Sequence, residues 1–298
     1  MSTLIVGSGA LACLFAARLA AIGEAVSMLA TWPEGLRALQ ETGATLEYDD
    51  TRTTFPVRAS NNPQDFAGAA RALVLVKSWQ TTRVAEQLQA CLAPEGVALT
   101  LQNGLGNQET LVSALDAARV AVGVITTGAT LLGPGIVRWG GDGIITLGAH
   151  AQQASFAALF EQAGFQVHLA ESVASVQWSK LVINAAINPL TALLNIPNGE
   201  LLTRPAAAAL SAQLAQEAAA TAAALDIPLT FADPVAAAQD VARRTAANHS
   251  SMLQDVLRGA PTEINAICGA IVRAGQSAGV PTPANDMLWK LVEALTPA

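Results

Sequence analysis

A glycine-rich turn near the amino terminus constrains the fold more than any other stretch of this 298-residue chain. Residues 3–6 are apolar and read as a strand, residues 7–12 read Gly-Ser-Gly-Ala-Leu-Ala, and an apolar helix-forming run covers residues 11–22. Strand, glycine turn and helix in this order are typical of a unit that binds a dinucleotide, with alanine accepted for the third glycine. Gly7 permits the tight turn, and Gly9 lets the backbone approach a pyrophosphate at the positive end of the helix. An ordinary strand-to-helix turn is the alternative.

The end of the second predicted strand, residues 25–29, bears on the choice of nicotinamide cofactor. An acidic residue about twenty positions after the glycines would bind the ribose 2′-hydroxyl of NAD. Here the sequence continues Ala-Thr-Trp, with neither an acid nor an immediate base. Thr31 could donate to a 2′-phosphate, with Arg37 in the next helix as a charge partner.

Polar residues follow two further apolar segments. Residues 73–76 run into Lys77-Ser-Trp-Gln, and residues 97–101 run into Gln-Asn103-Gly. Ligands gather at the carboxyl ends of strands in open α/β sheets, so Lys77 and Asn103 are candidate binding residues. A simple turn is the alternative for the Asn-Gly pair. Other strands are expected in 44–58, 119–126, 136–147 and 165–169.

A run from Trp178 to Leu190 predicts a helix with one polar face, ended by Pro189. Lys180, Asn184 and Asn188 lie four residues apart, so their side chains line the same face of that helix. An ammonium and two amides on an otherwise apolar helix cost stability unless they meet partners or a ligand. We interpret the face as the wall of an active site; a solvent-exposed polar stripe is the alternative.

The pattern after Glu171 is helical throughout. Helices are expected over 206–225, 234–247 and 261–278, with loops over 195–201 and 248–255. Glu263 falls in the first turn of the last predicted helix, where the helix dipole favours a carboxylate. The expected fold is α/β: an N-terminal Rossmann-type doubly wound sheet in residues 1–170 and an all-α domain in residues 171–298.

Charge and composition exclude several classes of partner. The net charge of −7 argues against nucleic acid, and the three histidines lie too far apart in the sequence for a histidine metal site. Three scattered cysteines fit a reduced, cytoplasmic protein. The apolar stretch 4–22 lacks a basic start and carries Arg18, so neither a signal peptide nor a membrane association is expected.

Several motifs spread over the whole chain carry a resemblance to a known family. The most specific are K-L-V-I-N-A-A-I-N-P-L-T-A-L from Lys180 with N-I-P-N-G-E-L, and H-S-S-M-L-Q-D with T-E-I-N. G-S-G-A-L-A, K-S-W-Q and Q-N-G-L-G support them. Together they resemble ketopantoate reductase, also called 2-dehydropantoate 2-reductase. The resemblance implies a Rossmann domain, a helical domain and an active site in the cleft between them.

The activity that the resemblance implies is the NADPH-dependent reduction of 2-dehydropantoate to (R)-pantoate, in pantothenate and coenzyme A biosynthesis. Lys180 would be the general acid. Glu263 heads a predicted helix of the same domain, and from that position we expect it to be the catalytic companion of Lys180. The keto acid would be bound by Asn103, Asn184, Asn188, Asn198 and Ser251. NADPH would be held by Gly7, Ser8, Gly9, Ala10, Leu11, Ala12, Lys77, Asn103, Ala129 and Glu263, to which the reading of the second strand adds Thr31.

The proposed proton donor agrees with the chemistry of carbonyl reduction. Hydride arriving at a ketone carbon leaves an alkoxide, which must be neutralised as it forms. Without a histidine in the cleft, the Lys180 ammonium is the natural donor, while amides and a hydroxyl orient the substrate without adding a competing charge.

Three positions differ from the family's usual pattern. Thr31 stands where many members have an arginine that grips the 2′-phosphate, and Thr127 stands where histidine is common. Ala260 and Pro261 replace an arginine often found shortly before the Thr-Glu pair. NADPH is therefore expected to be preferred by a reduced margin, and use of NADH stays open.

Two rival functions remain. One is a reductase of another branched 2-oxo acid on the same scaffold, which a panel of keto acids would identify. The other is a non-catalytic sensor that binds NAD(P)H without turnover, against which the retained Lys180 and asparagines argue. A homodimer is left open.

Overall fold

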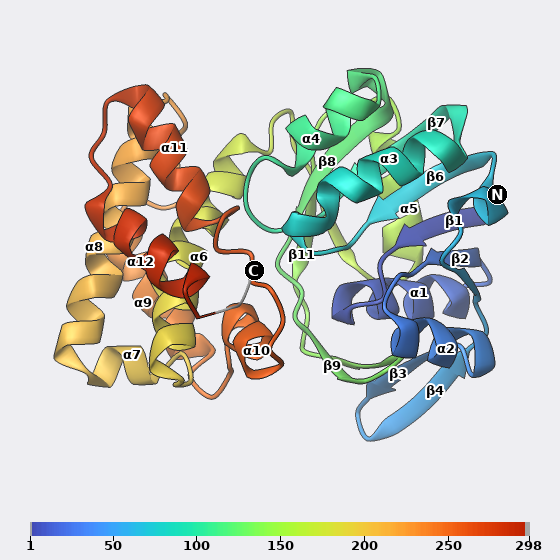
Figure 1. Cartoon of the computed structure of the whole chain (residues 1–298), viewed down its shortest axis with the longest axis horizontal. Helices are drawn as coiled ribbons and strands as arrows, with labels where there is room; N and C mark the ends of the chain where they lie inside the picture. Colours follow the sequence, from blue (N-terminus) through green and yellow to red (C-terminus); the bar gives the residue numbers. More distant parts are fainter. Residues whose placement is uncertain (1, 296–298) are drawn as a thin grey trace. The chain divides into compact units, whose positions relative to one another are not determined.

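Eight strands of the amino-terminal region form one mostly parallel sheet with helices on both faces (Figure 1). The computed structural model describes residues 2–295, and spatial contacts divide the chain into two units. The sheet unit comprises residues up to 102 together with 107–173. The helical unit comprises residues 103–106 together with those from 174 on.

The sheet unit contains twelve strands and five helices between residues 2 and 173. Its strands are β1 (Ser2–Val6), β2 (Ala25–Leu29), β3 (Ala44–Tyr48), β4 (Thr51–Phe55), β5 (Arg58–Ser60), β6 (Ala69–Val74), β7 (Leu92–Thr100), β8 (Val120–Ile125), β9 (Ala129–Gly133), β10 (Ile136–Trp139), β11 (Ile144–Leu147) and β12 (Gln166–Leu169). Its helices are α1 (Ala10–Ala21), α2 (Pro33–Glu41), α3 (Thr81–Cys91), α4 (Asn107–Ala114) and α5 (Gln153–Gln162), with short 3-10 turns η1 (Pro63–Phe66), η2 (Ser78–Gln80) and η3 (Ala117–Arg119).

The strand order of the large sheet is β12-β11-β8-β7-β6-β1-β2-β5. Neighbouring strands are parallel, except that β11 runs antiparallel to β8. The direction in which strands are added to the sheet reverses at β1. Strand β2 lies on one side of β1, and β6, which comes later in the chain, lies on its other side. Such a switch point is where open α/β sheets bind ligands, outside the carboxyl ends of the strands. The predicted Rossmann-type sheet is confirmed.

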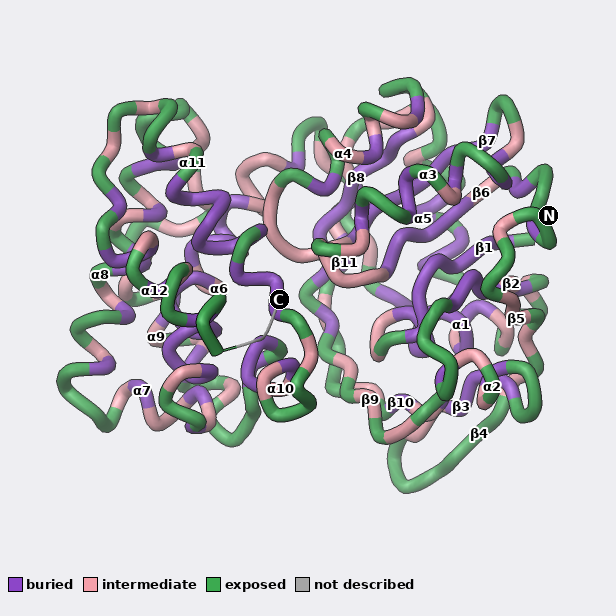
Figure 2. The backbone as a smooth tube through the Cα atoms, viewed as in Figure 1, coloured by how far each residue is buried: buried purple, intermediate pink, exposed green. Residues whose placement is uncertain are grey.

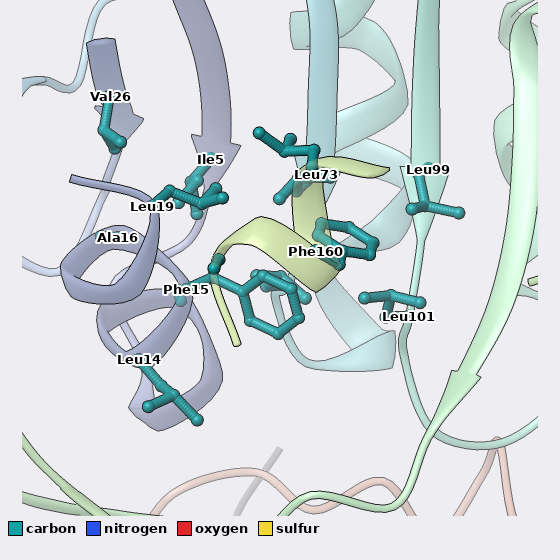
Figure 3. Close-up of a cluster of buried hydrophobic side chains, with 14 of the residues drawn as sticks. Ile5, Leu14, Phe15, Ala16, Leu19, Val26, Leu73, Leu99, Leu101 and Phe160 are labelled. Atoms are coloured by element: carbon teal, nitrogen blue, oxygen red, sulfur yellow. The ribbon is translucent and has the colours of Figure 1, made fainter. Parts of the chain in front are cut away.

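Apolar side chains fill both faces of this sheet. On one face Phe15 of α1 stacks on Phe165 with ring centroids 4.6 Å apart, and Phe160 of α5 meets Phe15 edge-on. Figure 3 shows Phe15 and Phe160 gathered with Ile5 and the strand leucines of this core. On the other face, buried residues of α3 and α4 pack against β1, β6 and β7. Burial on both faces explains why the central strands read as continuous apolar runs.

A second, four-stranded sheet has the order β4-β3-β10-β9. Its β3–β4 hairpin turns at Asp49 and Asp50, both with positive φ, as a two-residue hairpin turn requires. Helix α1 contacts β3, β9 and β10 and so ties this sheet to the large one. In Figure 2 β4 is exposed along its length, which fits an edge strand rich in threonine.

The helical unit is built around one long helix. Its elements are α6 (Ala174–Leu194), α7 (Glu200–Thr203), α8 (Pro205–Ala224), α9 (Pro234–Arg244), α10 (Ser251–Leu257), α11 (Cys268–Ala278) and α12 (Pro283–Glu293). Helix α6 contacts α8, α9, α10 and α12, so it lies at the centre of the unit. Between residues 2 and 295, no helix combines the length and the apolar character that crossing a bilayer would need.

The predicted end of the central helix at Pro189 is wrong, because α6 continues to Leu194. A proline removes one backbone donor and crowds the carbonyl four residues earlier, which here belongs to the small residue Ala185. Beyond the proline, the Thr191 hydroxyl donates to the carbonyl oxygens of Ile187 and Asn188, both at 3.0 Å. Burial of the last turn in the core offsets the lost hydrogen bond.

Other boundaries in this unit also differ from the prediction: α7 begins at Glu200 inside the expected loop 195–201, and α9 ends at Arg244 instead of residue 247. Residues 251–257, expected as a loop, form α10, which Ser250 caps by accepting a hydrogen bond from the Leu253 N–H. The helix expected over 261–278 begins only at Cys268. Upstream, the Asn265 carbonyl accepts from the Arg273 side chain at 2.9 Å. The Ala266 carbonyl accepts from the Leu105 N–H at 3.0 Å. Two carbonyls are thereby diverted from helical pairing, so the regular helix starts later.

Candidate active site

The turn between β1 and α1 exposes backbone at the start of the helix. Gly7 has φ +126° and donates its N–H to the Leu29 carbonyl, and an added Cβ would lie 3.0 Å from the Leu75 carbonyl oxygen. Gly9 caps α1, and an added Cβ there would meet nothing within 4 Å. The first turn of α1 carries no acidic side chain, and Ala12 is fully buried against the sheet. An open, unblocked helix amino terminus fits an anionic pyrophosphate.

The carboxyl ends of β6 and β7 are joined by one side chain. The Gln102 amide donates to the Val76 carbonyl at 3.1 Å and to the Thr81 hydroxyl at 2.9 Å. Lys77, partly buried, follows directly after Val76. Lys77 therefore follows the strand β6, which lies beside β1 in the sheet.

The exposed Thr31 lies just beyond β2 and has a partner that sequence reasoning missed. Arg83, on α3, donates from Nη2 to the Thr31 hydroxyl oxygen at 2.9 Å. The sequence suggested Arg37 instead, because that residue is close along the chain. Arg83 is separated from Thr31 by 52 residues, and only the parallel sheet brings the two together.

Ala129, expected to contact the cofactor, starts strand β9 and pairs with Trp139 of β10. Just before it, Thr127 is 7% exposed, and its hydroxyl is a buried polar atom for which no partner occurs within residues 2–295. Gly128 accepts a hydrogen bond from the Gly140 N–H at 2.8 Å, which holds this segment against β10.

The polar face of α6 lies as predicted, and one end of it meets a loop from far away in the sequence. Lys180 and Asn184 are partly buried, and Asn188 is 7% exposed. The Lys180 ammonium donates to Oδ1 of Asn103 at 2.7 Å. The Asn103 amide nitrogen in turn donates to Oε2 of Glu263 at 3.2 Å. One asparagine therefore bridges the two charged candidates of the site.

The loop Asn103–Gly106 is held in the helical unit by backbone contacts. The first contact is the hydrogen bond from the Leu105 N–H to the Ala266 carbonyl. The second constraint is at Gly104, which has φ +78° and where an added Cβ would clash with that same carbonyl. Only glycine combines this backbone conformation with so close an approach. These constraints place the Asn103 amide beside Lys180 and Glu263.

Burial changes the acidity of the Lys180 ammonium. Removal from water lowers the pKa of Lys180 from 10.5 to about 8, and the negative charge of Glu263 opposes part of that shift. Glu263 is itself only 5% exposed. A lysine that titrates near neutral pH can both hold and release a proton under working conditions.

Asn198 and Ser251 are not part of this hydrogen-bonded bridge. Asn198 donates from Nδ2 to the Thr245 hydroxyl at 2.9 Å and from its backbone to the Asn248 carbonyl, which ties the loop after α6 to the end of α9. Its Oδ1 is buried without a partner among the residues that the structure describes. Ser251 is exposed at the first position of α10. Neither side chain hydrogen-bonds to Lys180, Asn103 or Glu263.

No cluster of histidine, cysteine, aspartate or glutamate in the described part of the chain has the arrangement of a metal site. Two of the three cysteines, Cys13 and Cys268, are fully buried, and burial raises the pKa of each thiol.

Known proteins match both units of the chain. The family model "Ketopantoate reductase PanE/ApbA" matches residues 3–152, and "Ketopantoate reductase PanE/ApbA C terminal" matches residues 172–296. The 2-dehydropantoate 2-reductase of Halobacterium salinarum is 34% identical, with 98% of each chain covered.

Solved structures give the same result. A PanE/ApbA family ketopantoate reductase from Ralstonia eutropha has a TM-score of 0.92 at 34% identity, covering 99% of this chain and 98% of that one. A D-mandelate dehydrogenase in complex with NADH has a TM-score of 0.87 at 25% identity, with 99% and 98% covered. With matches of this extent in both sequence and structure, the chain belongs to the ketopantoate reductase family.

Proposed function

We propose that this protein reduces 2-dehydropantoate to (R)-pantoate with NADPH, and so serves pantothenate and coenzyme A biosynthesis. The observation that carries the proposal is the bridge from Lys180 through Asn103 to Glu263, with a lysine pKa lowered to about 8. The relatives named 2-dehydropantoate 2-reductase support the choice of substrate. NADPH, when bound, supplies the hydride.

The reaction needs a proton at the carbonyl oxygen while negative charge develops there. Lys180 donates that proton from its ammonium, and the Asn103 carbonyl oxygen, which accepts a hydrogen bond from it, fixes where the ammonium points. Glu263 keeps the ammonium protonated by opposing the effect of burial. Loss of the Glu263 charge would leave less of the lysine charged at neutral pH.

The remaining polar residues position the reactants in this proposal. Asn184 and Asn188 continue the Lys180 face of α6 and orient the keto acid, together with Asn103, Asn198 and Ser251. In the sheet unit, the turn Gly7–Ala12 and Lys77 hold the pyrophosphate and ribose of the cofactor, together with Thr31 and Ala129. Amides and hydroxyls suit this role because they fix a carboxylate and a hydroxyl without adding charge.

The experiment that tests this function measures NADPH oxidation with 2-dehydropantoate, and identifies the product as (R)-pantoate by chiral chromatography. A strain that requires pantothenate because it lacks this reductase should grow when it expresses the protein, but not when it expresses Lys180→Ala. Binding of NADPH without turnover of any 2-oxo acid would instead favour a sensor.

A second candidate is the reduction of a different 2-oxo acid. The observation that favours it is the match to D-mandelate dehydrogenase, a protein of the same fold whose named substrate is an aromatic 2-hydroxy acid. A panel that includes phenylglyoxylate and branched aliphatic 2-oxo acids separates the two. A higher kcat/KM for one of these than for 2-dehydropantoate would replace the first proposal.

A further inference from the structure

Arg83 is an exposed arginine near the end of β2 that has no acidic partner. Its guanidinium donates to the Thr31 hydroxyl at 2.9 Å, and no carboxylate within residues 2–295 lies at ion-pair distance from it. Most other arginines in the sheet unit are paired or bonded to carbonyls, as Arg52 is to Glu47 and Arg119 to the Gly96 and Ala93 carbonyls. Arg83 therefore presents open donors to a ligand.

In Rossmann-type folds, the residues at the end of the second strand distinguish NAD from NADP, because they contact the 2′-position of the adenosine ribose. β2 lies directly beside β1, whose glycine turn fits the pyrophosphate, so the adenosine ribose of a bound cofactor would point toward Thr31. No acidic residue follows β2 until Glu34, in the first turn of α2. A ribose 2′-hydroxyl has no carboxylate to bind there, whereas a 2′-phosphate meets a guanidinium.

We propose that Arg83 selects NADPH over NADH by binding the 2′-phosphate, and that Thr31 is a positioning residue that orients its guanidinium. This inference rests on the proposed use of a nicotinamide cofactor, and it identifies the residue that discriminates between the two forms. The positive charge is that of the Arg83 guanidinium on α3, which follows β6, because the residues directly after β2 include no arginine or lysine. Arginine suits the role because its planar fork can bind two phosphate oxygens at once.

The bond to Thr31 uses one nitrogen of the guanidinium, Nη2, and leaves the remaining donors of the fork for the phosphate. A long, exposed side chain loses conformational freedom on binding, and a hydroxyl that already holds it in place reduces that loss. Because the site is exposed, salt screens the attraction, so the preference for the phosphorylated cofactor should weaken as ionic strength rises.

Ligand binding tests the proposal without requiring turnover. Dissociation constants for NADP⁺, NAD⁺ and 2′,5′-ADP are measured by calorimetry for the parent protein and for Arg83→Ala, Arg83→Lys and Thr31→Val. Arg83→Ala should weaken NADP⁺ and 2′,5′-ADP by roughly tenfold or more, the order expected for a charge-assisted contact, and leave NAD⁺ within twofold. Arg83→Lys should keep part of the affinity, and Thr31→Val should lose less than Arg83→Ala.

Arg243→Ala is the matched control, since it removes one exposed positive charge from the helical unit, where Arg244 still pairs with Asp240. It should leave both nucleotides unaffected. The salt dependence of NADP⁺ binding should be steeper in the parent than in Arg83→Ala.

Equal NADP⁺ affinity in the parent and Arg83→Ala, or an equal loss for NADP⁺ and NAD⁺, would overturn the inference. Loss of NADP⁺ binding in Arg37→Ala but not in Arg83→Ala would transfer the role to Arg37. A parent that binds NADP⁺ but turns over no keto acid would refute the proposed function alone, because the binding comparison would still decide the role of Arg83. A parent that binds neither nucleotide would refute both.

Discussion

The shifted acidity of Lys180 predicts an unusual pH profile for the reduction. A general acid must be protonated, so kcat/KM should be constant below the pKa and fall tenfold per pH unit above it. With the pKa of Lys180 at about 8, the fall should begin near pH 8 and not near 10.4, the ordinary value for lysine. The measurement is the initial rate of NADPH oxidation at saturating NADPH from pH 5 to 10.

Removing the charge of Glu263 should move this profile to lower pH. Glu263→Gln keeps an oxygen that can accept from the Asn103 amide but loses the anion that raises the lysine pKa. Loss of this charge is expected to lower the pKa of Lys180 by about one unit, the lower end of the range typical for a neighbouring opposite charge.

The expected loss of activity therefore depends on pH. At pH 8 the protonated fraction of Lys180 should fall about fivefold in Glu263→Gln, whereas at pH 5 both proteins keep a protonated lysine. Deuterated NADPH shows whether hydride transfer limits the rate, so that the profile reports the chemical step. Glu200→Gln, which removes a more exposed carboxylate of the same unit, is the matched control and should leave the profile unchanged.

Removal of the lysine itself completes this test. Lys180→Ala should reduce kcat by roughly two to four orders of magnitude while cofactor affinity stays near the parent value, and methylamine in the buffer should restore part of the rate. A parent profile that breaks near pH 10, a break that Glu263→Gln does not move, or a Lys180→Ala rate within a few-fold of the parent would each refute the assignment of the proton donor.

Three further predictions concern the walls of the site. Asn184→Ala and Asn188→Ala should each raise KM for the keto acid with little effect on NADPH binding, as measured by steady-state kinetics beside thermal unfolding; unchanged kinetics would remove that residue from the site. Gly104→Ala should lower the free energy of unfolding by about 1–3 kcal/mol, because a side chain there strains the backbone and strikes Ala266; a urea titration measures this, and a neutral result would contradict the close approach. Gly9→Ala should fold normally, since its Cβ meets nothing, yet weaken NADP⁺ binding by calorimetry; full affinity would show that the backbone there does not approach the cofactor.

Local signals in the sequence were sufficient for the glycine turn with its flanking strand and helix, and for the common face of the polar residues on α6. The glycine turn with its flanking apolar runs predicts β1 and α1, and the fourfold spacing of Lys180, Asn184 and Asn188 predicts their common face. Both depend on residues within a few turns of each other, where periodicity determines geometry.

What the sequence left undetermined depends on contacts between distant segments. The helix start at Cys268 follows from carbonyls taken by Leu105 and Arg273, and the passage of α6 through Pro189 follows from burial and a threonine hydroxyl. The pairing of Arg83 with a residue 52 positions away is of the same kind. Local propensity carries no information about such partners, so the prediction placed helix ends at the prolines and looked for the cation nearby in sequence.

The loop Asn103–Gly106 has a consequence for how members of this family can be recombined. The loop is encoded between β7 and α4, yet it belongs to the helical unit, where it carries the amide that links lysine to glutamate. A chimera made by a single crossover near residue 171 would join one parent's asparagine loop to another parent's α6 and Ala266. Such hybrids should keep activity only when the donor loop retains Asn103 and Gly104, and a gene fragment that starts at residue 171 should produce a helical unit that lacks its bridging amide.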